Sequence, residues 1–215
     1  VGKKILSTGN GRCNLTNYKM EEDCYRCGRK DFPMQVIRGF DVKETLDLFM
    51  GLGIVPKDRN GYVYPNSDQA ASVLDVLRTE LERLKVRILL SCQIEKIEKK
   101  KNGGFLVHTD QGKVETDALI LAAGSKAAPS TGSDGSGYEY ARQLGHSVIK
   151  PLPALVQLRC QGNLYKQMAG IRTEAEVRLQ ADGITLASDR GELQITDYGL
   201  SGIPIFQVSR YAARA

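Results

Sequence analysis

No long apolar run occurs in these 215 residues, although 41% of them are hydrophobic. A transmembrane helix needs about 18 or more consecutive apolar residues, so the sequence excludes a span of this kind within the chain. The five cysteines are odd in number and lack the spacing of a disulfide framework, which fits a reducing compartment. A charged fraction of 26% is ordinary for a folded domain. We therefore expect a globular, cytoplasmic protein with no membrane partner.

Metal ligands are also scarce, because the chain has only two histidines, His108 and His146. Cys24 and Cys27 form an isolated Cys-x-x-Cys pair, whereas a structural zinc site needs four ligands at suitable spacing. Completion by Cys13 and a histidine is one reading and a redox dithiol is another, but no spacing supports either. We expect no metal site and interpret the pair as two incidental thiols.

Stacking aromatic residues are missing from the densest positive segment, which runs from Lys96 to Lys101. The net charge of +5 and a pI near 8.9 permit weak attraction to nucleic acid or to an anionic cofactor. However, Glu95 and Glu98 are interleaved with the lysines. A solvated strand end fits this pattern better than a nucleic-acid-binding stripe, so we do not expect a nucleic-acid partner.

A short loop from Gly9 to Asn17 is rich in hydrogen-bond donors. Its glycines and asparagines tolerate positive φ angles, which lets backbone N–H groups approach a ligand closely. Arg12 and the amides of Asn14 and Asn17 add donors suited to a phosphate or to the edge of a heterocycle. An ordinary glycine-rich turn explains these residues equally well, so the loop alone leaves both readings open.

Helical signals dominate the first third of the chain. Asp41 to Glu44 resembles a capping box and predicts a helix that ends near Gly51. A stronger helix follows, with residues 66–68 as its predicted cap and apolar residues at helical spacing over about 17 positions. Residues 18–40 lack clean periodicity, and we expect irregular structure there with one short helix.

After the second helix the pattern changes to a period of two or to short apolar runs. Residues 86–90 predict a buried strand, and the segments 93–99, 104–109 and 113–116, separated by turns, predict a β-meander. The apolar run 117–124 ends in glycine and predicts a strand buried on both faces of a parallel sheet. This order favours the α/β class, with a partial doubly wound dinucleotide-binding domain whose crossover is the meander.

A second candidate anion contact lies at the start of a helix, where glycines surround Asp134. Free N–H groups at a helix N-terminus favour negative charge, so a phosphate contact is one reading. A plain capped helix, ended by Gly145, is the other reading, and the residues by themselves favour it.

Pro151 and Pro153 favour extended backbone and mark a boundary. Beyond them, apolar and polar residues alternate over 156–160, over 174–179 and in two runs between 184 and 196. This alternation predicts an antiparallel sheet or partial barrel with one face in water.

Five segments stand out when the chain is read as a whole: Lys3 to Asn17, Gly61-Tyr62-Val63-Tyr64-Pro65, Leu121-Ala122-Ala123-Gly124 with the following helix to His146, Pro153-Ala154-Leu155-Val156, and Thr196 to Gly202. In this order they resemble the signature of a bacterial family of FAD-dependent oxidoreductases, of the two-dinucleotide-binding-domain flavoprotein type. Members of that family include aminoacetone oxidases and a bile-acid-pathway flavoprotein.

The resemblance implies that FAD is the cofactor, that NAD(P)H can serve as electron donor, and that the substrate is a small molecule. It points to no catalytic residue in this chain. The cofactor-binding residues that it implies are Gly9, Gly11, Arg12, Cys13, Asn14, Thr16, Asn17, Ile94, Ala122, Ala123 and Gly124.

Flavoproteins of this type open with a strand and a Gly-x-Gly-x-x-Gly turn, which this sequence lacks. We therefore expect an internal fragment, in which residues 1–150 form a partial FAD-binding domain and residues 151–215 begin an inserted β-rich domain on the substrate side. Alone, such a fragment should bind FAD weakly or not at all. Two alternatives remain, a cofactor-free scaffold of the same fold and a flavoprotein that acts on RNA. The sequence indicates no oligomeric state.

Overall fold

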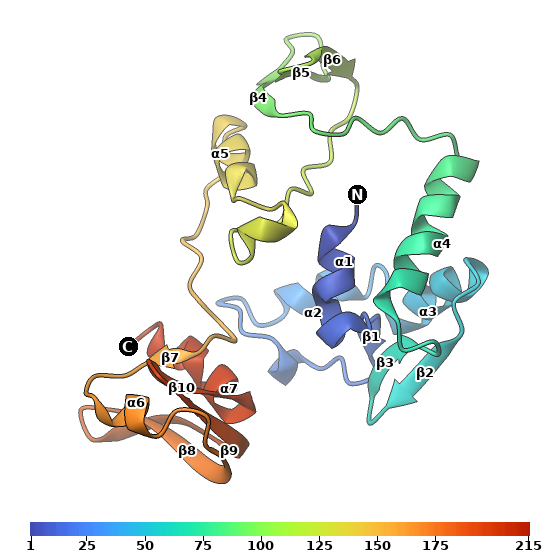
Figure 1. The fold of residues 1–215 in the computed structure, drawn as a ribbon. Coiled ribbons are helices and arrows are strands. Elements are labelled where there is room, and N and C mark those ends of the chain that lie inside the picture. The colour runs from blue at the N-terminus through green and yellow to red at the C-terminus, as the bar shows by residue number, and fades with distance from the viewer. The chain divides into compact units, whose positions relative to one another are not determined.

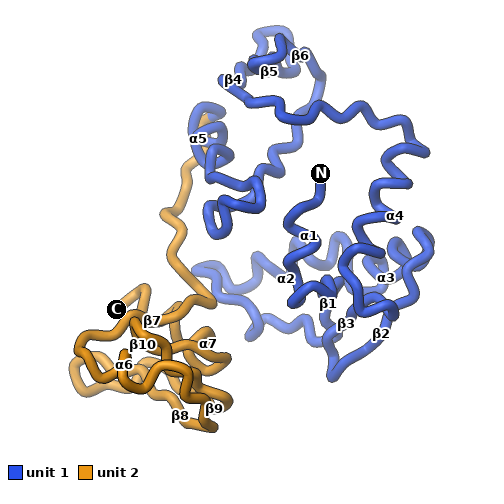
Figure 2. The backbone as a smooth tube through the Cα atoms, in the orientation of Figure 1, with its two compact units in different colours: residues 1–144 blue, residues 145–215 orange.

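The computed structural model describes residues 1–215, which form two compact units. Unit 1 comprises residues 1–144 and unit 2 comprises residues 145–215 (Figure 2). None of the helices combines the length and the apolar character that a membrane crossing requires. The assignment of residues 1–150 to a flavin domain and of residues 151–215 to an inserted domain stays a prediction.

The α-helices and β-strands of unit 1 are labelled in Figure 1. In chain order they are α1 (Lys3–Ser7), η1 (Thr8–Gly11), β1 (Thr16–Asn17), η2 (Glu22–Cys24), α2 (Phe32–Ile37), α3 (Val42–Gly51), β2 (Pro56–Arg59), β3 (Tyr62–Pro65), α4 (Ala70–Arg83), β4 (Ile94–Lys99), β5 (Phe105–Thr109), β6 (Gly112–Thr116), η3 (Pro129–Thr131) and α5 (Ser136–Gln143).

A three-stranded antiparallel sheet organises the N-terminal part of unit 1, with strand order β1-β3-β2. The helix α4 packs against α1. Beside them lies a small apolar core made by Cys13, Ile54, Ala70 and Val73. The short helices η2 and α2 are the only regular elements between β1 and α3, which agrees with the irregular segment predicted there.

The two long helices of this part begin differently. At α3 the predicted capping box is confirmed, because Asp41 Oδ1 accepts from the Glu44 N–H at 3.0 Å and Glu44 Oε2 accepts from the Asp41 N–H at 2.8 Å. The predicted cap of α4 is wrong, since the N-cap residue is Gln69. Asp68 instead adopts a left-handed φ of 53° and pairs with two cations of β2. A contact distant in sequence has therefore replaced the local cap.

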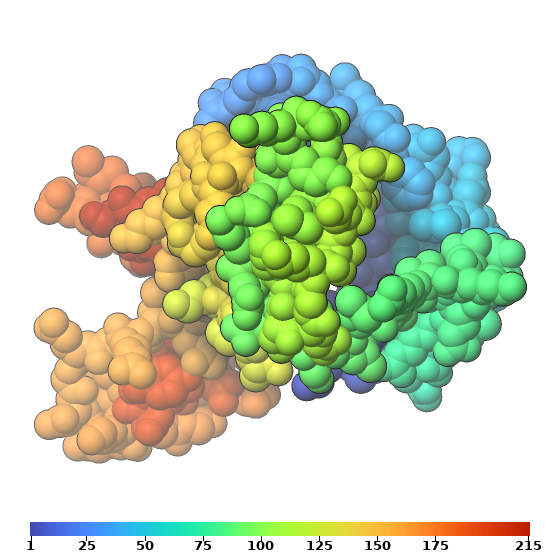
Figure 3. Space-filling model, turned by 90° about the horizontal axis from the view of Figure 1, so that it is seen from above, coloured from blue at the N-terminus to red at the C-terminus, as the bar shows by residue number.

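The predicted β-meander is confirmed as the antiparallel sheet β4-β5-β6. Its apolar side carries Ile97 and Val107, which are buried together with Tyr140 of α5. The Tyr140 hydroxyl donates to the Ile94 carbonyl at 2.6 Å, which ties α5 to the first strand of the meander. Figure 3 shows the golden α5 segment beside the green meander.

Two predicted strands are wrong. Residues 86–90 and 117–124 belong to no strand, and Ile120 is 89% exposed. All strand pairs in the structure are antiparallel, so neither segment has a neighbour with which to form a parallel sheet. An apolar segment favours burial, but it forms a β-strand only where its backbone N–H and C=O groups can hydrogen-bond to a neighbouring strand.

Unit 2 is a four-stranded antiparallel sheet of order β7-β10-β9-β8, and α7 packs on it. The predicted alternation is confirmed in β8, where Val177 and Leu179 are half-buried while Glu176 and Arg178 are exposed. Segment 156–160 is strand only at its centre, and β10 was not predicted. The elements are β7 (Leu158–Arg159), α6 (Leu164–Gln167), β8 (Arg172–Ala181), β9 (Ile184–Thr196), β10 (Gly199–Gly202) and α7 (Ile203–Ala212).

Candidate functional site

The Gly9–Asn17 loop follows α1 directly and contains a tight left-handed coil. Gly9, Asn10, Gly11 and Cys13 have φ angles of 54°, 55°, 81° and 63°. The Arg12 N–H donates to the Gly9 carbonyl at 3.2 Å, and the Cys13 N–H donates to the Thr8 carbonyl at 3.0 Å. These short-range bonds fix the turn, so the loop has its shape before any ligand arrives.

Gly9 and Gly11 play different parts in this coil. A Cβ added at Gly9 would lie 2.7 Å from the Asn14 backbone nitrogen and 3.1 Å from Cε1 of Tyr64. A Cβ added at Gly11 would meet no atom within 4 Å. Gly9 therefore allows the loop to close on itself, whereas Gly11 faces open space into which a ligand can come.

Asn14 does not offer its amide N–H groups to a ligand. Its Nδ2 atom donates to the Thr16 carbonyl at 3.1 Å and to the Val63 carbonyl at 3.0 Å. The Leu15 N–H also donates to the Val63 carbonyl, at 2.8 Å. Asn14 thus pins the loop to β3, and the donor role that the sequence suggested for its amide is occupied by the protein itself.

The remaining side chains of the loop are also partly committed. Asn17 Oδ1 accepts from the Lys19 N–H at 2.8 Å, and Thr16 is buried where β1 pairs with β3. Cys13 is only 9% exposed and belongs to the apolar core. Its thiol is therefore a small packing group beneath the loop.

Arg12 is the one cationic side chain of this loop, and it is exposed. No hydrogen bond or ion pair of the structure engages its guanidinium. A guanidinium donates in pairs to phosphate oxygens or to neighbouring carbonyl oxygens. With the open space at Gly11, this free donor set fits an anionic and carbonyl-rich cofactor such as FAD.

The second group of predicted cofactor contacts lies near the start of α5. The Cβ of Ala123 is 3.0 Å from the Cβ position of Gly137, and a Cβ at Gly124 would lie 2.6 Å from Ser133 Oγ. Ala122 is exposed, and Ile94 is half-buried at the start of β4. No hydrogen bond or ion pair joins this group to the Gly9–Asn17 loop.

The start of α5 already carries a negative group. Asp134 Oδ1 accepts from the Ser136 N–H at 2.9 Å, and this hydrogen bond lowers the pKa of the Asp134 carboxyl. The carboxylate therefore disfavours an anion at the first N–H of α5, but the N-cap residue itself, Gly135, makes no side-chain cap hydrogen bond.

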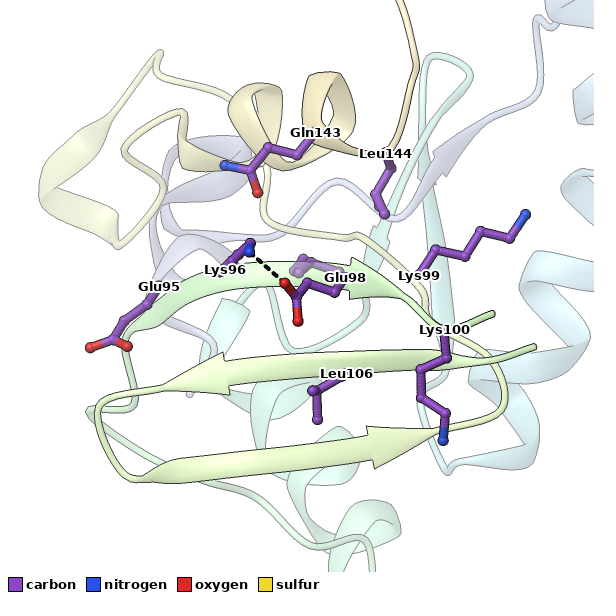
Figure 4. A pocket seen from close by; sticks show the side chains of 9 residues that line it. Glu95, Lys96, Glu98, Lys99, Lys100, Leu106, Gln143 and Leu144 are labelled. Atoms are coloured by element: carbon purple, nitrogen blue, oxygen red, sulfur yellow. Dashed lines mark hydrogen bonds and ion pairs between the residues drawn. The ribbon is translucent and has the colours of Figure 1, made fainter. Parts of the chain in front are cut away.

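An open groove of about 850 Å³ lies between the meander and the end of α5. In Figure 4, Glu98 points toward Lys96 while Glu95 points away from both. Hydrogen bonds from Lys96 and then His108 lower the pKa of Glu98. The groove includes none of the Gly9–Asn17 residues. Its lining residues are Glu95, Lys96, Ile97, Glu98, Lys99, Lys100, Leu106, Gln143 and Leu144.

No group of three or more His, Cys, Asp or Glu side chains is placed to hold a metal ion. Cys24 and Cys27 are both free and exposed.

One cluster of charges was not foreseen from the sequence. Asp68 Oδ2 lies 3.0 Å from Lys57 Nζ and 2.5 Å from Arg59 Nη2. These hydrogen bonds, first from Lys57 and then from Arg59, lower the pKa of Asp68. The sequence does show Lys57 and Arg59 at alternate positions of a short segment, which is the one signal for this cluster. Their partner Asp68 could not be predicted, because a left-handed turn at Asp68 brings its carboxylate to them.

The chain matches the family model described as HI0933-like protein Rossmann domain over residues 1–209. It is 48% identical over 214 residues to a 3-dehydro-bile acid delta(4,6)-reductase of Clostridium scindens, covering 100% of this chain and 52% of that protein. It is 27% identical over 214 residues to a ribosomal RNA dihydrouridine synthase of Escherichia coli, covering 98% of this chain and 52% of that protein. The same enzyme of Haemophilus influenzae is 24% identical over 217 residues, with coverage of 98% and 53%.

The chain thus spans about half the length of the curated relatives that it matches. A Rossmann domain is an α/β fold, so the predicted fold class is confirmed. The resemblance to a family of flavoprotein oxidoreductases is confirmed as well. Because the family model extends over nearly all of its residues, the chain belongs to the HI0933-like Rossmann domain family.

Proposed function

We propose that this chain is part of a flavin-dependent oxidoreductase and that its Gly9–Asn17 loop contacts the flavin cofactor. The observation that carries the proposal is 48% identity, across the full chain, to a reductase of the same family. The loop supports it, because a preformed coil with a free guanidinium and an open glycine face suits an anionic, planar cofactor.

The cofactor in this proposal is FAD, which when bound supplies hydride and electron transfer. Arg12 donates to the phosphate or carbonyl oxygens of the cofactor. Gly11 keeps the approach free of side-chain atoms, and Asn14 holds the loop on β3. NAD(P)H is the proposed electron donor.

The proposed substrate is a 3-oxo bile acid with carbon–carbon double bonds conjugated to the ketone. The name of the Clostridium scindens relative contains this chemistry, and that relative is far more similar to this chain than the RNA-modifying relatives are. Reduction adds a hydride and a proton across the double bond and oxidises NAD(P)H to NAD(P)⁺.

The test uses the full-length protein. We expect it to show the visible absorbance of a flavin, to release FAD on denaturation, and to consume NAD(P)H when a 3-oxo-4,6-diene bile acid is added. A colourless protein that fails to take up added FAD contradicts the flavin proposal. A yellow protein that does not consume NAD(P)H with this substrate supports the flavin proposal and excludes the bile acid as its substrate.

RNA modification is the second candidate, because two of the relatives are ribosomal RNA dihydrouridine synthases and the chain has a net charge of +5. Binding through phosphates weakens steeply as salt rises. Salt-dependent binding of ribosomal RNA by the full-length protein would favour this candidate, and no binding at low salt would remove it.

A further inference from the structure

We propose that one face of the β1-β3-β2 sheet binds the carboxylate end of an amphipathic acid, with Lys57 and Arg59 as its cations and Tyr62 under its apolar part. The inference rests on the proposed function, because it assigns the acid group of the bile acid to a place on this chain. Of the residues on this face, only Asn17 also belongs to the Gly9–Asn17 loop that is proposed to contact FAD.

The strand register sets this face. Asn17 lies opposite Tyr62 and Tyr62 lies opposite Arg59, so these side chains form one row across the sheet. Tyr64 lies opposite Lys57 and continues the same face in the next row. Directly opposed residues in antiparallel strands project to the same side of a sheet. Tyr62 is 52% exposed, so an aromatic surface stands in the open beside the cations.

The charge of the face favours an anion. Two cations share the single carboxylate of Asp68, which leaves one positive charge without a counter-charge in the cluster. The Lys57 and Arg59 side chains are each 39% exposed, so a ligand can reach both. Asp58, the acidic residue of β2, points to the other side of the sheet from Lys57 and Arg59 and accepts from the Gly61 N–H at 2.7 Å.

The cluster of Lys57, Arg59 and Asp68 has features that lower the stability of the fold. Arg59 Nε and Asp68 Oδ1 are buried without a hydrogen-bond partner, and Asp68 is held in the left-handed region at φ 53°. Unsatisfied buried polar atoms and a left-handed aspartate both destabilise the folded state. Structures keep such features chiefly where they serve a site, and here they hold two cations together on one side of a strand.

The face also borders the proposed flavin loop. Gly9 packs against the ring of Tyr64, and Asn17 ends the loop at the edge of the Tyr62 row. A flat apolar molecule lying over Tyr62 therefore has one end toward the loop and the other toward Lys57 and Arg59. This is the polarity of a steroid acid whose reacting ring system lies far from its carboxylate.

The experiment measures binding of a bile acid and of its methyl ester to the full-length flavoprotein by calorimetry, and KM and kcat for both. Arg59→Gln and Lys57→Gln should each weaken binding of the acid about two- to fivefold and leave the ester unchanged. Asp68→Asn should tighten binding of the acid, because asparagine tolerates the left-handed backbone and removes the competing carboxylate. Lys43→Gln, an exposed cation of α3, is the matched control and should change nothing.

Arg59→Gln should weaken binding of the acid, whereas Asp68→Asn should tighten it. A general loss of structure would weaken binding in both variants, so these opposite changes identify an effect of charge. Equal shifts for acid and ester, or no shift in any variant, would overturn the proposal. Loss of FAD from Arg59→Gln with no change in acid binding would overturn it too, since the cations would then serve the cofactor. If Asp68→Asn does not fold, the comparison of acid and ester binding by Arg59→Gln and Lys57→Gln still tests the proposal. Absence of turnover with either ligand removes the bile acid as the proposed substrate, while the binding comparison still tests this face.

Discussion

Substituting Gly9 by alanine tests the geometry of the proposed flavin loop. At φ 54° an alanine is strained by about 1–2 kcal/mol relative to glycine. Its Cβ would lie 2.7 Å from the Asn14 backbone nitrogen, and a backbone atom cannot move aside as a flexible side chain can. The loop must therefore shift, which weakens the two Asn14 hydrogen bonds that pin it, each contributing about 1 kcal/mol. We expect a total loss of about 2–4 kcal/mol.

Gly11→Ala is the matched control, because Gly11 has a φ of 81° but free space around its Cβ position. It should lose only the backbone strain of about 1–2 kcal/mol. Urea unfolding of the FAD-free full-length protein measures the stability of both variants. If Gly9→Ala unfolds at the same urea concentration as Gly11→Ala, the close approach inferred at Gly9 is wrong.

Three further changes have expected outcomes. Asn14→Asp replaces an amide donor with a carboxylate that cannot donate to the Val63 carbonyl, so urea unfolding should show a loss of about 1–3 kcal/mol; an unchanged midpoint would contradict the pinning role. Tyr140→Phe removes the hydroxyl that donates to the Ile94 carbonyl and should lower stability by about 1 kcal/mol, with hydrogen exchange rising first at the meander. Because the pKa of Asp68 is lowered in the folded protein, its stabilising contribution is present above an unfolded pKa of about 3.9 and is lost as pH falls through the folded value. Asp68→Asn should thus be less stable than wild type at neutral pH and approach it below about pH 4 in an unfolding series, and a gap that stays constant with pH would speak against the ion pairs.

Local patterns predicted the elements whose stabilising contacts are local. The α3 helix follows from Asp41 and Glu44, which cap each other three residues apart. The meander follows from alternating residues and short turns, because each strand pairs with the next one along the chain. Segments 86–90 and 117–124 have equally clear apolar patterns, but no adjacent strand in the chain pairs with them. Their conformation depends on partners that the local sequence does not contain.

The candidate site shows the same division. The left-handed coil at Gly9 and Gly11 follows from residue type, and so does the small buried thiol of Cys13. The use of the Asn14 amide could not be predicted, because its acceptor on Val63 lies 49 residues away. The charge cluster at Asp68 was missed for a related reason, since it replaces a local helix cap by contacts with β2.

Flavin retention by an Arg12→Gln variant tests whether the Gly9–Asn17 loop binds FAD. The full-length wild-type protein and the variant are purified side by side, and FAD per protein and the Kd for added FAD are measured from flavin absorbance and fluorescence. Arg12 has no partner within the protein, so its loss should leave the unfolding midpoint of the FAD-free protein unchanged. We predict a flavin-bearing wild type and a variant that binds FAD about tenfold more weakly, as expected for a lost charge-assisted contact. A variant that binds FAD as tightly as wild type, or a wild type that binds none, would contradict the account.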